Sequence, residues 1–297
     1  MCTSWGFYAH KKINETAVYL LPVDISPFYK RHIKIITDKA VDADKRCYVD
    51  TIEPPKHYID LDEFDIQDTI PIHWSKATEL FTERKLLTRG IIPWQISKSY
   101  QQLVNAFKNK NVNLIIKYSA DLGHYVADAH VPLHTTSNYN GQFSNQIGIH
   151  AFWETRLPEK FSSQYSYVIG KPRYIDDVNQ EAWKFVNSSH ALVDSVLRVE
   201  KELASKFKNK NIRSYILRNN VLTLNYSDEY ATAYHEALNG MVERRMRESI
   251  YYVASLWYSA WVDAGQPNMH NTQVDQNTEQ ENIDLNNRKQ IGRQEWH

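Results

Sequence analysis

The 297-residue sequence has little of several features that would assign its class directly. Its only cysteines, Cys2 and Cys47, are too few for a disulfide framework and too far apart in sequence to argue for a bridge. The sequence contains no run of about 18 apolar residues, so it predicts no transmembrane helix. Neither sign of charge dominates, because 35 Lys and Arg residues balance 35 Asp and Glu residues. No global field therefore points to nucleic acid or an anionic membrane, and any phosphate chemistry must rely on local charge, such as bound metal ions.

A secretory signal is also missing, because the chain begins without a charged segment followed by an apolar one. Two explanations stay open at this stage: an intracellular protein, or an exported protein whose signal has been removed. In the second case Cys2 would suit a lipid-modified cysteine, although an incidental cysteine is the favoured interpretation.

Apolar residues recur at helical spacing over most of the chain, whereas no internal repeat and no clear strand pattern is present. We predict an all-α fold, a single multi-helical domain of seven or eight helices over residues 1–267. Residues 268–297 are polar, rich in Asn and Gln, and lack periodicity, so we expect a disordered tail. The predicted helices cover residues 5–21, 24–40, 74–109 with a break near Gly90 and Pro93, 111–131, 177–208 and 228–263.

A potential metal site lies in residues 121–154, which contain histidines and carboxylates at helical spacing. His124 and Asp128 are four residues apart in an apolar-periodic segment, so on a helix their side chains leave one face about a turn apart. Pro132 ends that helix, and His134 follows two residues later, near the C-terminal end of the helix. A polar loop over 138–148 then leads to a second pair.

That second pair is His150 and Glu154, again four residues apart on a segment that is predicted to be helical. One such pair is most often a packed histidine with a hydrogen-bonded acid. Two pairs so close together favour metal binding instead. Imidazole and carboxylate ligands without a nearby thiolate suit zinc in a hydrolytic site rather than a structural one.

The order and spacing of these polar residues in the first half of the chain resemble those of the trinuclear-zinc phosphodiesterase superfamily. This superfamily contains bacterial zinc-dependent phospholipases C and fungal single-strand-specific zinc nucleases. The resemblance spans residues 5–154, and its most diagnostic segment is HYVADAHVPLH, which begins at His124. The matching positions are Trp5, His10, Asp42, His57, His124, Asp128, His134, His150 and Glu154.

The resemblance implies up to three zinc ions. Asp42, His57, His124 and Asp128 would hold the first, and Asp128 would bridge to the second. The second would take His10 together with the amino and carbonyl groups of Trp5. The third would be held by His134, His150 and Glu154. Asp42 is also the candidate catalytic base for an attacking water, and Asp121 is a candidate to orient His124 from behind.

Some positions depart from the family pattern. The tryptophan is the mature N-terminus in the family, whereas Met1 to Ser4 precede Trp5 here, so its amine is available only if these residues are cleaved. Glu154, the short gap between His134 and His150, and a loop containing Asn138, Asn140 and Asn145 favour the phospholipase branch. The spacing from Trp5 to His10 is closer to the nuclease pattern.

The leading hypothesis is a zinc-dependent phosphodiesterase that is phospholipase C-like and cleaves a phospholipid headgroup, with a membrane surface as its substrate. The alternatives are a single-strand nuclease or 3′-nucleotidase and a non-catalytic helical module that binds metal for stability. No protein partner is implied, and we expect a periplasmic, extracellular or surface-anchored location. The candidate substrate-wall residues, each equally explained as core packing, are Tyr58, Tyr125, Tyr139, Phe143 and Phe152.

Overall fold

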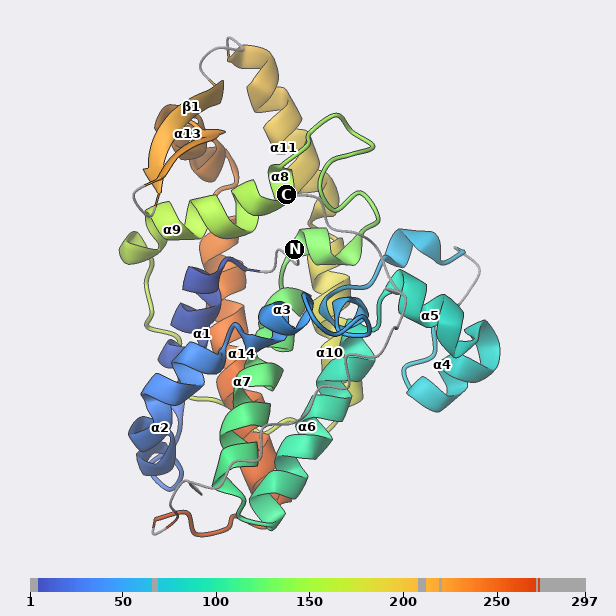
Figure 1. The fold of residues 1–297 in the computed structure, drawn as a ribbon, viewed down its shortest axis with the longest axis vertical. Coiled ribbons are helices and arrows are strands. Elements are labelled where there is room, and N and C mark those ends of the chain that lie inside the picture. The colour runs from blue at the N-terminus through green and yellow to red at the C-terminus, as the bar shows by residue number, and fades with distance from the viewer. Residues whose placement is uncertain (1–4, 66–68, 208–211, 219–220, 271, 273–297) are drawn as a thin grey trace.

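The computed structural model describes residues 5–65, 69–207, 212–218, 221–270 and 272. It confirms the predicted all-α class, because helices account for most of these residues (Figure 1). The α-helices are α1 (Phe7–Leu20), α2 (Ser26–Lys39), α3 (Asp42–Arg46), α4 (Trp74–Phe81), α5 (Glu83–Arg89), α6 (Ile92–Lys108), α7 (Val112–Ala129), α8 (Ile149–Ala151), α9 (Leu157–Phe161), α10 (Val178–His190), α11 (Val193–Lys206), α13 (Asp228–Ala237) and α14 (Met241–Asp263). Four 3-10 helices, η1 (Pro54–His57), η2 (Leu61–Glu63), η3 (Pro132–Thr135) and η5 (Ser162–Gln164), and one π-helical turn, η4 (Phe152–Arg156), join them.

Helix α7 lies at the centre of the molecule and contacts α1, α2, α6, α10 and α14 (Figure 1). Every residue from Ser119 to Ala129 is buried, as expected for a helix that other helices surround. Trp257 of α14 shows how tightly this core packs. Its ring stacks on Tyr29 of α2 at a centroid distance of 4.8 Å, and its indole N–H donates to the Ser119 carbonyl at 2.9 Å. The central helix is therefore held from several sides.

Three of the predicted helices are interrupted where the backbone leaves the helical region. The segment 74–109 divides at Thr82, with φ 65°, and at Gly90, with φ 87°. The segment 228–263 divides at Gly240, with φ 72°. The segment 177–208 divides near Leu192 into α10 and α11. The sequence predicted the helical content and the break near Gly90, but not the breaks at Thr82, Leu192 and Gly240.

The prediction that the chain has no strands is wrong. Strands β1 (Arg213–Arg218) and β2 (Val221–Tyr226) form an antiparallel hairpin, in which Arg213 lies opposite Tyr226 and Leu217 opposite Leu222. The hairpin lies at one end of the molecule beside α13 (Figure 1). Each strand is six residues long, so the period-2 alternation extends over too few positions to stand out from the helical pattern of the chain.

Packing continues past the predicted domain end at residue 267. Met269 is buried in the core, and the Arg31 guanidinium donates to the carbonyls of Met269 and His270. Most of the predicted disordered tail, residues 271 and 273–297, lies outside the described residues, as does Cys2. Within the described ranges, none of the helices combines the length and the hydropathy needed to cross a bilayer.

Helices α1 and α7 approach closely at Gly123, next to His124. A β-carbon at Gly123 would lie 2.1 Å from Oδ1 of Asn14, a buried side chain that donates to the Ala120 carbonyl at 3.3 Å. The small residue lets α1 bring His10 against His124, and the two rings stack at a centroid distance of 3.9 Å. The close helix contact thus helps to determine the geometry of the candidate site.

We expect Gly123→Ala to destabilise the protein, because the added methyl group overlaps Asn14. Overpacking costs about 1–3 kcal/mol, offset by up to about 1 kcal/mol of improved helix propensity. In an Asn14→Ala background the overlap is gone, so the same substitution should be neutral or stabilising. Urea unfolding of the four proteins of this double-mutant cycle measures the difference. Equal costs in both backgrounds would contradict the close contact.

Candidate metal centre

The structure brings histidines and acids from seven separate elements into three neighbouring groups that could each hold a metal ion. His124 and Asp128 lie on the last turns of α7, and the other members come from α1, α3, η1, η3, α8 and η4. All of their side chains are buried. The groups are His10, His124 and Asp128; Asp44, His57 and His124; and His134, His150 and Glu154.

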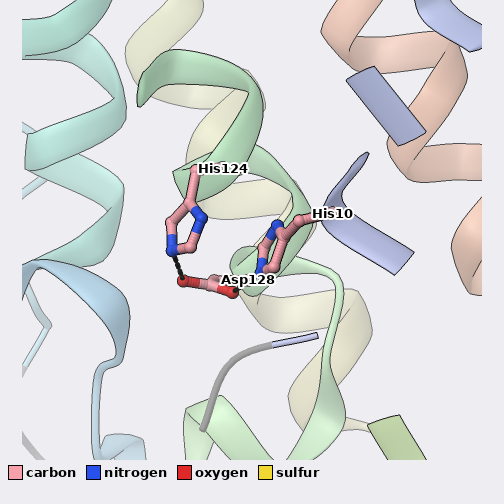
Figure 2. A group of neighbouring side chains, drawn as sticks. All are labelled: His10, His124 and Asp128. Atoms are coloured by element: carbon pink, nitrogen blue, oxygen red, sulfur yellow. Dashed lines mark ion pairs between the residues drawn. The ribbon is translucent and has the colours of Figure 1, made fainter. Parts of the chain in front are cut away.

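Asp128 joins the first two groups through its two carboxylate oxygens. Oδ1 lies 3.3 Å from Nε2 of His10, and Oδ2 lies 3.2 Å from Nε2 of His124 and 2.9 Å from Nδ1 of His57. Figure 2 shows Asp128 with the His124 ring on one side and the His10 ring on the other. One carboxylate is therefore placed to bridge two cations.

The orientation of His124 favours a cation over a neutral hydrogen-bond network. Its Nδ1 lies 2.8 Å from the Ala40 carbonyl, so in the neutral ring the proton sits on that nitrogen. The lone pair on Nε2 then faces Asp44 Oδ1 at 3.5 Å, Asp128 Oδ2 at 3.2 Å and His57 Nδ1 at 3.1 Å. Acceptor groups converging in a buried space need a proton or a metal ion between them.

The third group repeats this arrangement. Nδ1 of His134 donates to the His57 carbonyl at 2.6 Å, so its Nε2 presents a lone pair to Glu154 Oε2 at 3.2 Å. Nε2 of His150 lies 3.1 Å from the same oxygen. Glu154 lies on the π-helical turn η4, and such turns are often found at functional sites.

The pKa directions show that the buried groups favour positive charge at their centre. Burial lowers the pKa of His124, but the charges of Asp128 and Asp44 outweigh it and raise that pKa well above its usual value. Burial raises the pKa of Asp128, but the neighbouring imidazolium of His124 holds it well below its usual value. Burial, reinforced by the charge of His124, lowers the pKa of His10 to about 4, so His10 stays neutral at pH 7. A divalent cation would supply the positive charge without protonating a ligand.

The structure corrects the predicted role of Asp42. Its carboxylate is partly exposed and pairs with Lys45 at 2.9 Å and Lys39 at 3.5 Å, outside all three groups. Asp44 takes the position next to His57 and His124 instead. The two acids lie two residues apart on α3 and therefore face nearly opposite sides of the helix. Asp44 lies on the buried side of α3, which the spacing of the two acids alone does not indicate.

A second carboxylate that the sequence did not single out, Glu53, lies behind His57. Its Oε1 is 3.7 Å from Nε2 of His57, the nitrogen that faces away from the acids of the centre. Glu53 is buried and is held by Tyr125 at 2.5 Å, Arg46 at 3.1 Å and Lys56 at 2.5 Å. Cys47 Sγ lies 3.4 Å from the same nitrogen of His57, so Glu53 and Cys47 are the two groups that could orient the His57 ring from its outer side.

Other expected contributors lie elsewhere. Asp121 accepts from Arg46 at 3.1 Å, and the Ala40 carbonyl rather than Asp121 is bonded to His124. Trp5 is buried beside the centre, and its indole donates to the Ala127 carbonyl at 2.7 Å. Ligation of metal by the backbone of Trp5 stays a prediction. Of the proposed substrate-wall aromatics, only Phe143 is exposed, and those that form part of the interior are Tyr58, Tyr125, Tyr139 and Phe152.

Comparisons with known proteins give structural neighbours only. No family model matches the chain, and no curated protein matches it. The chain is similar to alpha toxin from Clostridium absonum, at 13% identity and a TM-score of 0.48, and to alpha-toxin from an avian strain of Clostridium perfringens, at 16% identity and a TM-score of 0.47. Each match covers 87% of this chain and 64% of the solved chain, so this chain spans less than two thirds of their length.

Asp44 and Asp42 provide a matched test of the metal ligands. We expect Asp44→Asn to weaken zinc binding by about a hundredfold or more, because loss of a direct ligand should exceed the 10–100-fold cost of losing an outer group. Asp42→Asn, which changes an acid on the same short helix, should leave affinity unchanged. Titration of the apoprotein with zinc against a chromophoric chelator measures both. Equal losses in the two variants would contradict the placement of Asp44.

For Glu53→Gln we expect zinc affinity to fall by about tenfold, at the low end of the range for such groups because the contact with His57 is long. Glu63→Gln, on the exposed surface, serves as the control. The same titration applies, and unfolding of the zinc-free proteins separates an effect on metal from one on the fold. An affinity equal to that of the unmodified protein would show that Glu53 does not orient His57.

Proposed function

We propose that the protein is a zinc-dependent phosphodiester hydrolase, phospholipase C-like, that cleaves a phospholipid headgroup with a zinc-activated water. The observation that carries this proposal is the position of Asp128, whose two oxygens face different groups of imidazoles. A structural zinc site closes around one ion with four ligands. A carboxylate shared between adjacent groups, with a third group close by, is the arrangement of a multi-ion catalytic site.

The residues that would hold the ions follow from the three groups. Asp44, His57, His124 and Asp128 would hold one ion, His10 and Asp128 a second, and His134, His150 and Glu154 a third. When bound, closely spaced zinc ions supply a hydroxide nucleophile near neutral pH and neutralise the phosphate oxygen and the leaving alkoxide. The backbone carbonyls of Ala40 and His57 orient the rings of His124 and His134 toward the centre. Burial keeps bulk water from these ligands and strengthens their electrostatic interactions.

The phospholipase branch is supported over the nuclease branch by residues close to the third group. Position 154 is occupied by glutamate, as in the phospholipases, and the gap between His134 and His150 is short, at residues 135–149. The aromatic side chains that would stack bases in a single-strand nuclease are mostly buried. A nuclease therefore remains the second candidate, and a purely structural metal module the third. A periplasmic, extracellular or surface-anchored location, where lipid headgroups are accessible, fits the first.

We expect zinc-loaded protein to hydrolyse phosphatidylcholine and to leave oligo(dT) and poly(U) intact. A chelator should abolish the hydrolysis, and zinc should restore it. His124→Ala should lose at least about a thousandfold in rate, because His124 belongs to two of the groups and its loss would remove a ligand of the zinc that activates the water. Release of phosphorylcholine measures the lipid reaction, and gel electrophoresis measures strand cleavage.

Asp42→Asn is the matched control for His124→Ala and should keep full activity. Cleavage of the oligonucleotides without lipid hydrolysis would replace the lipid assignment by the nuclease one. A fully zinc-loaded protein inactive on every substrate would favour the structural module. Full activity in His124→Ala would remove the metal mechanism.

A further inference from the structure

The β1–β2 hairpin presents an apolar face to solvent. Tyr215 lies opposite Leu224 and Leu217 opposite Leu222, so these four side chains share one face of the ribbon. Their exposed fractions are 69%, 54%, 70% and 64%. We call these four residues the apolar hairpin face. Contiguous exposed leucines of this kind mark a surface that contacts another apolar body.

At its base the same face is bound to the segment that carries the third metal group. Tyr226, two residues from Leu224, is buried and stacks on Phe152 at a centroid distance of 3.7 Å and an angle of 12°. Phe152 lies between His150 and Glu154 in sequence. The base of the hairpin therefore packs directly against the segment that carries His150 and Glu154.

A second apolar element lies next to the base of the hairpin. Arg213 places its guanidinium 4.0 Å over the Tyr226 ring and donates to the Ile147 carbonyl at 3.1 Å. Ile147 and Phe143 belong to the loop between the ligands His134 and His150, and they are 57% and 74% exposed. Arg213 thus connects the base of the hairpin to the loop that precedes His150, and both segments carry exposed apolar side chains.

We propose that the apolar hairpin face is the surface by which this protein binds a phospholipid bilayer, so that headgroups are presented to the metal centre. This inference rests on the proposed function. Leucine side chains partition into the acyl region, and tyrosine favours the headgroup level. Arg213, at the base of the face, matches the charge of lipid phosphates. The face would therefore contact a phospholipid bilayer rather than a single dissolved substrate molecule.

The area of the face argues against a second copy of the chain as the occupant. The four side chains expose on the order of 500 Å² together, whereas a stable dimer buries about 800 Å² on each partner. Lipid insertion needs no complementary protein surface, and its strength grows with each apolar side chain that leaves water.

The test compares Leu217→Ser/Leu222→Ser with the control Val23→Ser/Leu80→Ser, whose residues are 81% and 57% exposed on other parts of the molecule. Zinc-loaded proteins are assayed for co-sedimentation with phosphatidylcholine vesicles containing some phosphatidylserine. They are also assayed for hydrolysis of those vesicles and of dihexanoylphosphatidylcholine below its critical micelle concentration. We expect the hairpin variant to lose at least about tenfold in vesicle binding and vesicle hydrolysis. Its activity on the monomeric lipid, and all properties of the control variant, should be unchanged.

Equal vesicle binding by the hairpin variant and the unmodified protein would overturn the inference. So would a concentration-dependent dimer, seen by sedimentation velocity, that the hairpin substitutions dissociate. If the unmodified protein binds vesicles through this face but hydrolyses neither lipid form, the binding surface stands and the proposed function fails. If both lipid forms are hydrolysed equally in every variant, the function stands and the surface fails.

Discussion

The convergence of buried acceptor groups on shared positions is the constraint on which this structure depends. Carboxylate oxygens and imidazole lone pairs repel one another when they lie about 3 Å apart in a medium of low polarity. At Asp128 and His124 the chain brings such groups together and directs the ring protons away, to backbone carbonyls. Without a metal ion, protons must lie between these groups, and the acids accordingly raise the pKa of His124 well above its usual value. A divalent cation would convert the same contacts into ligand bonds, and would thereby link metal binding to the stability of this region.

The surrounding fold supplies what this convergence requires. Helix α7 supplies His124 and Asp128 from one rigid face, and the helices around it exclude water. Gly123 allows α1 to approach until the His10 and His124 rings stack. Glu53, fixed by hydrogen bonds, lies on the far side of His57. The site is thus built from the packing of the core, and the residues that position the ligands extend well beyond the ligands themselves.

Local spacing predicted much of this arrangement but not all of it. The pairs His124 with Asp128 and His150 with Glu154 follow from helical periodicity, and the structure brings both pairs into groups. Asp44 was overlooked because two acids on one short helix differ only in which side faces inward, and that depends on tertiary packing. Glu53 reaches His57 through a 3-10 turn and has no distinctive spacing in the sequence.

The hairpin was missed for a different reason. Its strands are short, and their exposed leucines carry no signal of burial, so period-2 alternation was not apparent. The breaks in the long helices likewise depend on single residues with positive φ, such as Gly240 and Thr82. A sequence pattern averaged over a helix does not resolve them.

His57 contributes to two parts of the centre at once. Its ring faces Asp128 and His124, while its carbonyl accepts the proton of His134, a member of the third group. An ion that fixes the His57 ring also fixes the backbone on which His134 depends. The ions are therefore expected to load cooperatively, with each ion bound lowering the entropic cost of ordering the ligands for the next. A centre linked in this way would fill as a unit, over a narrow range of zinc concentration.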